Sequence, residues 1–377
     1  MTLPVLQITP RFLPQIDGLG DYARLLAEHL RDSFGISSRF LVGDPQWSQL
    51  EKIGATPFQV EAVAARNADE LFRRLQKTET VILHYVTYGY HPRGVPFWIN
   101  RALRRWKTGQ TGRRLIVVFH EVWASGPPWK SEFFTSLIQR RLVVELHRLA
   151  DGVLTSTALM EGMLNKIQPG KTQLRPIPSA FPPMAAVGDR TFHRAGPIRV
   201  VAFGQEASRL LSIEVHEKLL RALHAAGLLS GVEVVGKGAD DGATPSSDIQ
   251  RLRSFLPAAL VRAYRDVSPA RGADLLQNAD LFLSYYPSIL ACKSSALTAA
   301  LAAGCVPVLP EARSPEPLRE GSEILACDGS EAQIAAAVAV IRAGKLGAMG
   351  EAGWQWYGQN ASWNAVTSAV ADMLVRH

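Results

Sequence analysis

The sequence predicts an α/β protein made of two doubly wound domains, each built on a parallel sheet. Its 377 residues exceed one ordinary core and suit two domains. Short apolar runs alternate with longer amphipathic segments, which is typical of parallel strands connected by helices. A stretch rich in proline and glycine, residues 176–197, interrupts this alternation, which then starts again. A content of 47% hydrophobic and 20% charged residues excludes wholesale disorder.

The elements of the first domain follow from its apolar runs and the amphipathic segments between them. The expected strands are residues 5–9, 38–42, 80–84, 115–120, 152–155 and 174–178. The expected helices are residues 21–34, 68–77, 95–107, 132–149 and 158–166. We expect this domain to cover residues 1–185, ending in the proline-rich stretch.

The second domain repeats the same alternation, and we expect it to cover residues 195–350. Its expected strands are residues 198–203, 232–235, 261–265, 281–284 and 306–309. Its expected helices are residues 211–226, 248–255, 269–277, 294–303 and 331–342. The tail after Leu346 is helical again and rich in tryptophan. Two such domains place a ligand cleft at the carboxyl ends of their strands.

The charge favours anionic partners without choosing among them. Lys and Arg number 41 and Asp and Glu 34, a formal surplus of seven. Nucleotide phosphates and anionic lipid both fit this surplus, whereas nucleic acid lacks a compact basic and aromatic patch to support it. Three cysteines without a CxxC pair indicate a reducing compartment. The sequence has neither a signal-peptide start nor eighteen consecutive apolar residues, so we expect a cytoplasmic protein, at most peripheral at the inner membrane face.

A glycine-containing turn follows the first strand. Gly18 and Gly20 lie where the chain bends into a helix, and a helix N-terminus offers amide donors to an anion. Neither a GxGxxG fingerprint nor a GxxxxGK[ST] loop is present. A phosphate contact and a plain strand-to-helix turn therefore both fit this segment.

His120 and Glu121 follow the apolar run 115–119 directly. In an open α/β sheet this position faces the ligand crevice, and a histidine beside a carboxylate suits sugar hydroxyls. His84 ends the preceding strand, which shows how readily a histidine occupies such a position by chance. The arginines of helix 132–149 are expected to form a solvated face rather than an anion site.

The sequence contains no motif typical of a metal site or of a serine hydrolase. HExxH, paired CxxC, Asp-x-Asp and GxSxG patterns are all missing from the sequence. Lys293, Ser294 and Ser295 lie between strand 281–284 and an alanine-rich helix, where an ammonium, hydroxyls and amides would converge on a phosphate. Ordinary serine capping beside an exposed lysine is the alternative.

The chain resembles the GT-B glycosyltransferases, and among them the large retaining group called family 4. The resemblance rests on FLPQIDGLGDY (residues 12–22), VVFHE (117–121), the block ADLFLSYYPSILACKSSALTAALAAGCVPVL (279–309) and Ser362-Trp363. It implies two Rossmann-like domains, with a final helix 362–377 that returns to the first. It also implies retaining transfer of a sugar from a nucleotide-diphosphate sugar to a glycan or lipid-linked hydroxyl acceptor, with no cofactor besides that donor.

The resemblance also assigns roles to residues. His120 corresponds to the active-site histidine, Glu121 to a sugar contact, and the diphosphate would lie among the following residues: Gly18, Gly20, Arg209, Lys293, Ser294 and Ser295. The family's two donor-site glutamates are replaced by Ala291 and Ala299.

This departure keeps two alternatives open. One is a non-catalytic GT-B-fold partner protein that binds carbohydrate or nucleotide, and the other is a GT-B-shaped sugar-nucleotide epimerase. A second diphosphate cation, Lys218, is less strongly indicated, because it lies well inside a helix.

Overall fold

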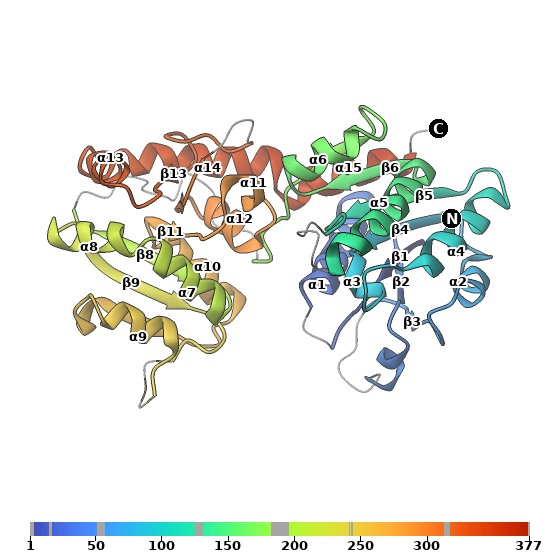
Figure 1. Cartoon of the computed structure of the whole chain (residues 1–377), viewed down its shortest axis with the longest axis horizontal. Coiled ribbons are helices and arrows are strands. Elements are labelled where there is room, and N and C mark those ends of the chain that lie inside the picture. The colour runs from blue at the N-terminus through green and yellow to red at the C-terminus, as the bar shows by residue number, and fades with distance from the viewer. Residues whose placement is uncertain are drawn as a thin grey trace. The chain divides into compact units, whose positions relative to one another are not determined.

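The computed structural model describes residues 4–14, 17–50, 57–124, 131–181, 196–240, 242, 244–312 and 317–375. The chain forms two compact units (Figure 1). The first consists of Met1–Arg175 with Trp363–His377, and the second of Pro176–Ser362. Residues 182–195, the centre of the expected interdomain stretch, lie outside the described residues.

The first unit contains a seven-stranded parallel sheet in the order β3-β2-β1-β4-β5-β6-β7. Its strands are β1 Val5–Thr9, β2 Ser38–Val42, β3 Val60–Ala62, β4 Thr80–Tyr85, β5 Arg114–Phe119, β6 Gly152–Thr155 and β7 Thr172–Leu174. Every residue of β1 and β6 is buried, as expected of parallel strands covered by helices on both faces.

Helices cover this sheet, and the last of them comes from the other end of the chain. They are α1 Gly18–Phe34, α2 Ala68–Leu75, α3 Thr87–Tyr90, α4 Phe97–Thr108, α5 Ser131–Leu149, α6 Ala158–Asn165 and α15 Trp363–Val375. The helix expected after residue 362 thus begins at Trp363, and it contacts α1 and β5 of the first unit. A short 3-10 helix, Pro45–Leu50, follows β2.

The second unit contains a six-stranded parallel sheet in the order β10-β9-β8-β11-β12-β13. Its strands are β8 Ile198–Phe203, β9 Leu229–Val235, β10 Val261–Tyr264, β11 Leu281–Leu283, β12 Val306–Leu309 and β13 Leu325–Ala326. Its helices are α7 Glu206–Val215, α8 Glu217–Ala225, α9 Ser247–Arg253, α10 Pro269–Gln277, α11 Ser288–Ala291, α12 Ser295–Ala302, α13 Glu331–Arg342 and α14 Leu346–Asn360.

Both sheets reverse their strand order at the centre, between β1 and β4 and between β8 and β11. In such sheets the crevice at the carboxyl ends of the two central strands is where ligands bind. The predicted fold class, two doubly wound parallel-sheet units, is confirmed.

Some elements differ from the sequence expectation. The helix expected over 211–226 is two helices, α7 and α8, because buried His216 breaks the turn with φ −104° and ψ 13°. The last strand of the first sheet lies at Thr172–Leu174 rather than at 174–178. The short strands β3 and β13 were not predicted, since two or three residues produce no apolar run.

One finding bears on membranes. Within the described residues no single helix combines the length and apolar content needed to cross a bilayer, although the bent pair Glu331–Arg342 and Leu346–Val375 meets both tests when taken together.

Candidate functional site

A chain of polar side chains crosses the centre of the first sheet. Gln7 on β1 donates from Nε2 to Ser38 Oγ at 3.0 Å. Its Oε1 lies 2.8 Å from His84 Nε2, and His84 Nδ1 lies 3.3 Å from His120 Nε2. His84 is near the carboxyl end of β4 and His120 directly follows β5, so the chain leads to the edge where a ligand crevice is expected. We call these four residues the histidine relay.

The relay determines which nitrogens carry protons. Because Gln7 uses its amide nitrogen on Ser38, its oxygen faces His84 and accepts from His84 Nε2–H. The Nδ1 of His84 is then an acceptor, so His120 donates to it from Nε2. Nδ1 of His120 is therefore the acceptor nitrogen of the neutral ring.

Burial holds His84 neutral. The side chain of His84 is fully buried, and this burial lowers its pKa from an ordinary value of 6.5 to about 3. Tyr22 of α1 packs edge-on against His120, with ring centroids 4.9 Å apart, and Trp363 of α15 packs on Tyr22. His120 is itself buried, 7% exposed, and its main-chain amide donates to Tyr85 O. The ring that ends the relay is thus held on several sides.

Packing explains one of the two glycines in the first turn of α1. A Cβ on Gly20 would lie 3.0 Å from Arg11 O and 3.3 Å from Phe12 Cα, so this backbone would have to shift by a few tenths of an ångström, whereas a Cβ on Gly18 would meet nothing within 4 Å. The carboxylate of Asp17 caps the helix by accepting from Gly20 N at 3.1 Å. Its negative charge already occupies the helix start that an anionic ligand would use. A phosphate contact at Gly18 and Gly20 stays a prediction.

In the second unit, the predicted phosphate cradle lies at the start of α12. Ser294 is the N-cap, and its Oγ accepts from Leu297 N at 3.2 Å. Ser295 is the first helical residue and is exposed, while Lys293 is half-buried in the preceding turn. The three residues are adjacent at a helix N-terminus, as expected, and their contact with phosphate stays a prediction. The same holds for a sugar contact by Glu121, which is half-buried beside His120.

The two alanines at the positions where the resemblance implies glutamates are core residues. Ala291 and Ala299 are both 0% exposed and belong to one apolar cluster with Phe282 and Leu301. A carboxylate at either position in this structure would have to be buried among apolar groups, at a large desolvation cost.

The side chain of Arg209 already has hydrogen-bond partners within the protein. Its side chain is fully buried, its Nε donates to Asp248 Oδ2 at 2.6 Å, and its Nη1 donates to the carbonyl oxygens of Gly204 and Lys237. It therefore ties the loops after β8 and β9 to α9. To bind a diphosphate, it would have to leave this pair. A diphosphate role stays a prediction that its contacts do not favour, and Lys218 is exposed on α8.

Two partners in these sites were missed from the sequence. Gln7 is a polar residue inside the fully buried run VLQIT, and a buried amide requires hydrogen-bond partners, so it could have been noticed. Asp248 carried no such indication, because it lies in an ordinary polar segment at the start of α9.

Comparison with known proteins identifies the fold. No family model matches the sequence, and no curated protein matches it. Solved structures do match over nearly the whole chain. A glycosyltransferase from Rickettsia africae is 13% identical with a TM-score of 0.62, covering 99% of each chain. The pneumococcal O-GlcNAc transferase GtfA, solved with UDP and GlcNAc, is 10% identical with a TM-score of 0.64, also covering 99% of each.

A third neighbour has a different activity. A putative UDP-N-acetylglucosamine 2-epimerase from Listeria monocytogenes is 13% identical with a TM-score of 0.53, covering 100% of this chain and 97% of the other. The chain therefore has the GT-B fold. At these identities the likeness extends to the fold alone.

Proposed function

We propose that this protein is a retaining glycosyltransferase that moves a sugar from a nucleotide-diphosphate sugar to a hydroxyl acceptor without a metal ion. The observation that carries the proposal is the histidine relay, which ends in an oriented His120 at the ligand edge of a GT-B-fold sheet. The glycosyltransferases among the structural neighbours support it.

His120 would contact the transferred sugar. Its Nδ1 would accept a hydrogen bond from a sugar hydroxyl while Nε2–H stays on His84. A neutral ring places no positive charge beside the sugar, whose anomeric carbon becomes electron-poor as the donor bond breaks. If His120 gains a proton at Nδ1, its hydrogen bond to His84 is retained, so the ring keeps its orientation. His84 and Gln7 would act as positioning residues.

The leaving diphosphate needs positive charge from the second unit. Lys293, with Ser294 and Ser295 at the start of α12, would supply an ammonium, a hydroxyl and amide donors. The leaving phosphate would itself take the proton of the acceptor hydroxyl, so the mechanism demands no protein nucleophile. The acceptor would be a glycan or a lipid-linked hydroxyl, and peripheral contact with the inner membrane face stays a prediction from the charge surplus.

A binding and turnover experiment tests the proposal. Thermal unfolding is followed with a panel of nucleotide-diphosphate sugars, and any donor that stabilises the protein is then assayed for hydrolysis and transfer with and without EDTA. We expect stabilisation by at least one donor and turnover that survives EDTA. Strict dependence of turnover on Mg²⁺ would contradict the metal-free mechanism.

The alternatives predict different outcomes of the same experiment. A non-catalytic partner protein, favoured by the buried alanines at positions 291 and 299, would give no turnover with any donor. An epimerase, whose fold the Listeria neighbour shares, would change the donor sugar with no acceptor present. Analysis of the products therefore separates the three functions.

A further inference from the structure

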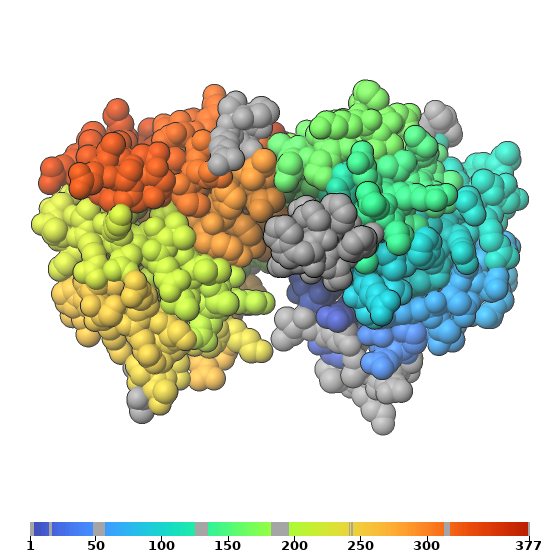
Figure 2. Space-filling model, in the orientation of Figure 1, coloured from blue at the N-terminus to red at the C-terminus, as the bar shows by residue number. Residues whose placement is uncertain are grey.

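The positive charge of this protein comes from one segment. Residues 101–175 contain 13 Lys and Arg against 5 Asp and Glu, whereas residues 1–100 contain 10 of each. Residues 176–362 contain 17 against 18, and residues 363–377 contain one of each. The segment 101–175 runs from within α4 to the end of β7. Figure 2 shows α4 and α5, in cyan and green, on the surface of the first unit.

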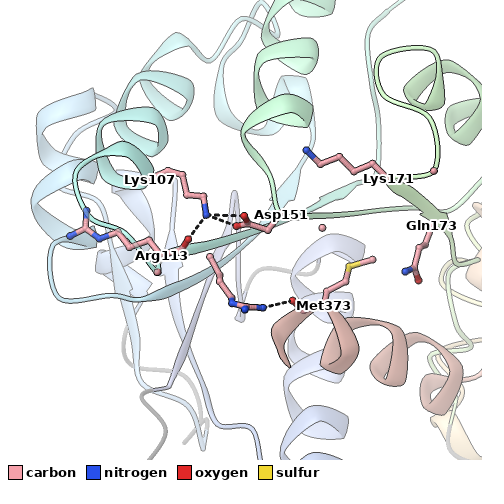
Figure 3. A pocket seen from close by; sticks show the side chains of 10 residues that line it. Lys107, Arg113, Asp151, Lys171, Gln173 and Met373 are labelled. Carbon is pink, nitrogen blue, oxygen red and sulfur yellow. Dashed lines mark hydrogen bonds and ion pairs between the residues drawn. The ribbon is translucent and has the colours of Figure 1, made fainter. Parts of the chain in front are cut away.

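A cavity of about 540 Å³ lies within this segment, at the amino-terminal ends of β5, β6 and β7 (Figure 3). Its lining residues are Lys107, Gly112, Arg113, Arg114, Asp151, Gly152, Gly170, Lys171, Gln173 and Met373. His120 follows the opposite, carboxyl end of β5. The cavity is therefore separate from the proposed sugar site. We call it the basic cavity.

Three of its charged groups are engaged with one another or with the neighbouring backbone. The carboxylate of Asp151 accepts from Lys107 Nζ at 2.6 and 2.9 Å and from Leu115 N at 2.7 Å. Arg113 turns away from the other labelled side chains in Figure 3, and its guanidinium donates to the carbonyl oxygens of Trp106 and Gln76. Asp151 and Lys107 neutralise each other, and Arg113 binds the backbone next to the cavity.

The other two cations of the basic cavity, like Arg113, have only neutral acceptors among the described residues. Arg114 Nη1 donates to the carbonyl oxygens of Met373 and Leu374, both at 3.2 Å. Lys171 Nζ donates to Arg148 O at 3.2 Å and to the side-chain amide of Gln168 at 3.4 Å. In the part of the chain that the structure describes, neither forms an ion pair.

The positive charges that line the basic cavity outnumber its negative charge. Burial lowers the pKa of Lys171, and Lys107 lowers it further, while Asp151 acts in the opposite direction. A bound anion would favour the charged form of Lys171 and offset its repulsion by Lys107. The cavity is also open to a ligand at two glycines, Gly112 and Gly170, where φ is +84° and +74° and a Cβ would meet nothing within 4 Å.

We propose that the basic cavity binds the phosphate group of a phosphomonoester. Arg114 would donate to phosphate oxygens from its planar guanidinium, and Lys171 would act as a point charge. Two cations without counter-ions match the dianionic charge of a phosphomonoester better than the single charge of a carboxylate. The phosphate belongs to a soluble molecule or to a lipid headgroup, and the two sources share this chemistry.

Binding of inorganic phosphate to the whole protein tests the site. Calorimetry and thermal unfolding are run at constant ionic strength on wild type, Lys171→Gln and Lys171→Arg. The control is Lys166→Gln, which removes an exposed lysine that does not line the cavity. We expect Lys171→Gln to weaken phosphate binding about tenfold or more, as loss of one charge-assisted hydrogen bond does. Lys171→Arg, which keeps the charge, should bind nearly as wild type, and so should Lys166→Gln.

Further arms identify the source of the phosphate. Glycerol 3-phosphate represents a soluble ligand, and phosphatidylcholine vesicles with and without phosphatidic acid represent a headgroup. Binding that depends on Lys171 in either arm supports the site and names its source. The proposal is overturned if phosphate does not bind to wild type, or if Lys171→Gln binds it as tightly as Lys166→Gln. Donor turnover should be unchanged in Lys171→Gln, so this result is independent of the proposed glycosyltransferase activity.

Discussion

The two units of this protein share a topology and differ in how they bury polar groups. Each has a parallel sheet whose strand order reverses at its centre. At the carboxyl edge of its sheet the first unit buries two histidine side chains, His84 and His120, joined by a hydrogen bond. The second unit buries the charged pair of Arg209 and Asp248. The same architecture thus holds the histidine relay in the first unit and a buried ion pair in the second.

The largest expected effect tests whether the ion pair of Arg209 and Asp248 has a structural role. Asp248→Ala leaves the guanidinium of Arg209 buried without its counter-ion, and breaking a buried pair in this way costs about 3–5 kcal/mol of unfolding free energy. Chemical denaturation measures the loss. The control is Asp274→Ala, which removes an exposed partner of Arg271 and should cost about 1 kcal/mol or less.

The opposite outcome would remove the contrast between the units. If Asp248→Ala is as stable as wild type and binds nucleotide more tightly, then the freed Arg209 serves a ligand, as the sequence suggested, and both units bury charge for function.

A second prediction concerns how the second unit would bind phosphate. Lys293→Ala should weaken binding of a nucleotide diphosphate about ten- to hundredfold, because it removes a charge-assisted hydrogen bond. Binding of the matching nucleoside should not change. The control is Lys345→Ala, which removes an exposed lysine just before α14. His120→Ala should instead lower turnover and leave diphosphate binding nearly intact. Calorimetry with both ligands separates these roles, and an unchanged diphosphate affinity in Lys293→Ala makes this residue a surface lysine.

The fold was predictable because it depends on local patterns. The apolar runs of β1, β2, β6, β8 and β12 gave their observed boundaries, since a buried parallel strand needs only such a run. The broken helix at His216 was not predictable, because its cause is a hydrogen bond to Ser284 O from a distant part of the chain. The site was partly predictable. His120 was found by its position after a strand, but Gln7, which reaches it through His84, is 113 residues away in the sequence, and only folding brings them into one relay.

A third prediction concerns the histidine relay, which the second unit is not proposed to share. Gln7→Met removes the acceptor that holds His84 in its Nε2–H form, so His120 loses its fixed tautomer. We expect turnover to fall about tenfold, the lower end of the effect of removing a residue that orients a functional histidine. Binding of the bare nucleotide diphosphate should stay unchanged. Nitrogen-15 NMR of the wild-type imidazoles should show His120 protonated at Nε2. A wild-type His120 protonated at Nδ1 would disprove the relay whatever the enzyme's activity.

The smallest expected effect is a dependence of stability on pH that comes from buried histidines of the first unit. Burial lowers the folded-state pKa of His84 to about 3 and that of His147 to about 4, from 6.5 in both cases. The folded state therefore favours their neutral forms, and the unfolded state binds more protons as the pH falls below about 6.5. Stability is complete above that pH and decreases toward the folded-state pKa values. Each histidine contributes a slope of up to about 1.4 kcal/mol per pH unit.

Urea denaturation across this pH range measures the slope. His147→Gln keeps a polar partner for Thr172 Oγ1, which lies 3.0 Å from His147 Nε2, but does not titrate. It should remove one histidine's share of the slope. The control is His224→Gln on α8, where the ring is exposed in the folded state and the slope should not change. If both variants retain the full slope, His147 exchanges protons equally well in the folded and unfolded chain.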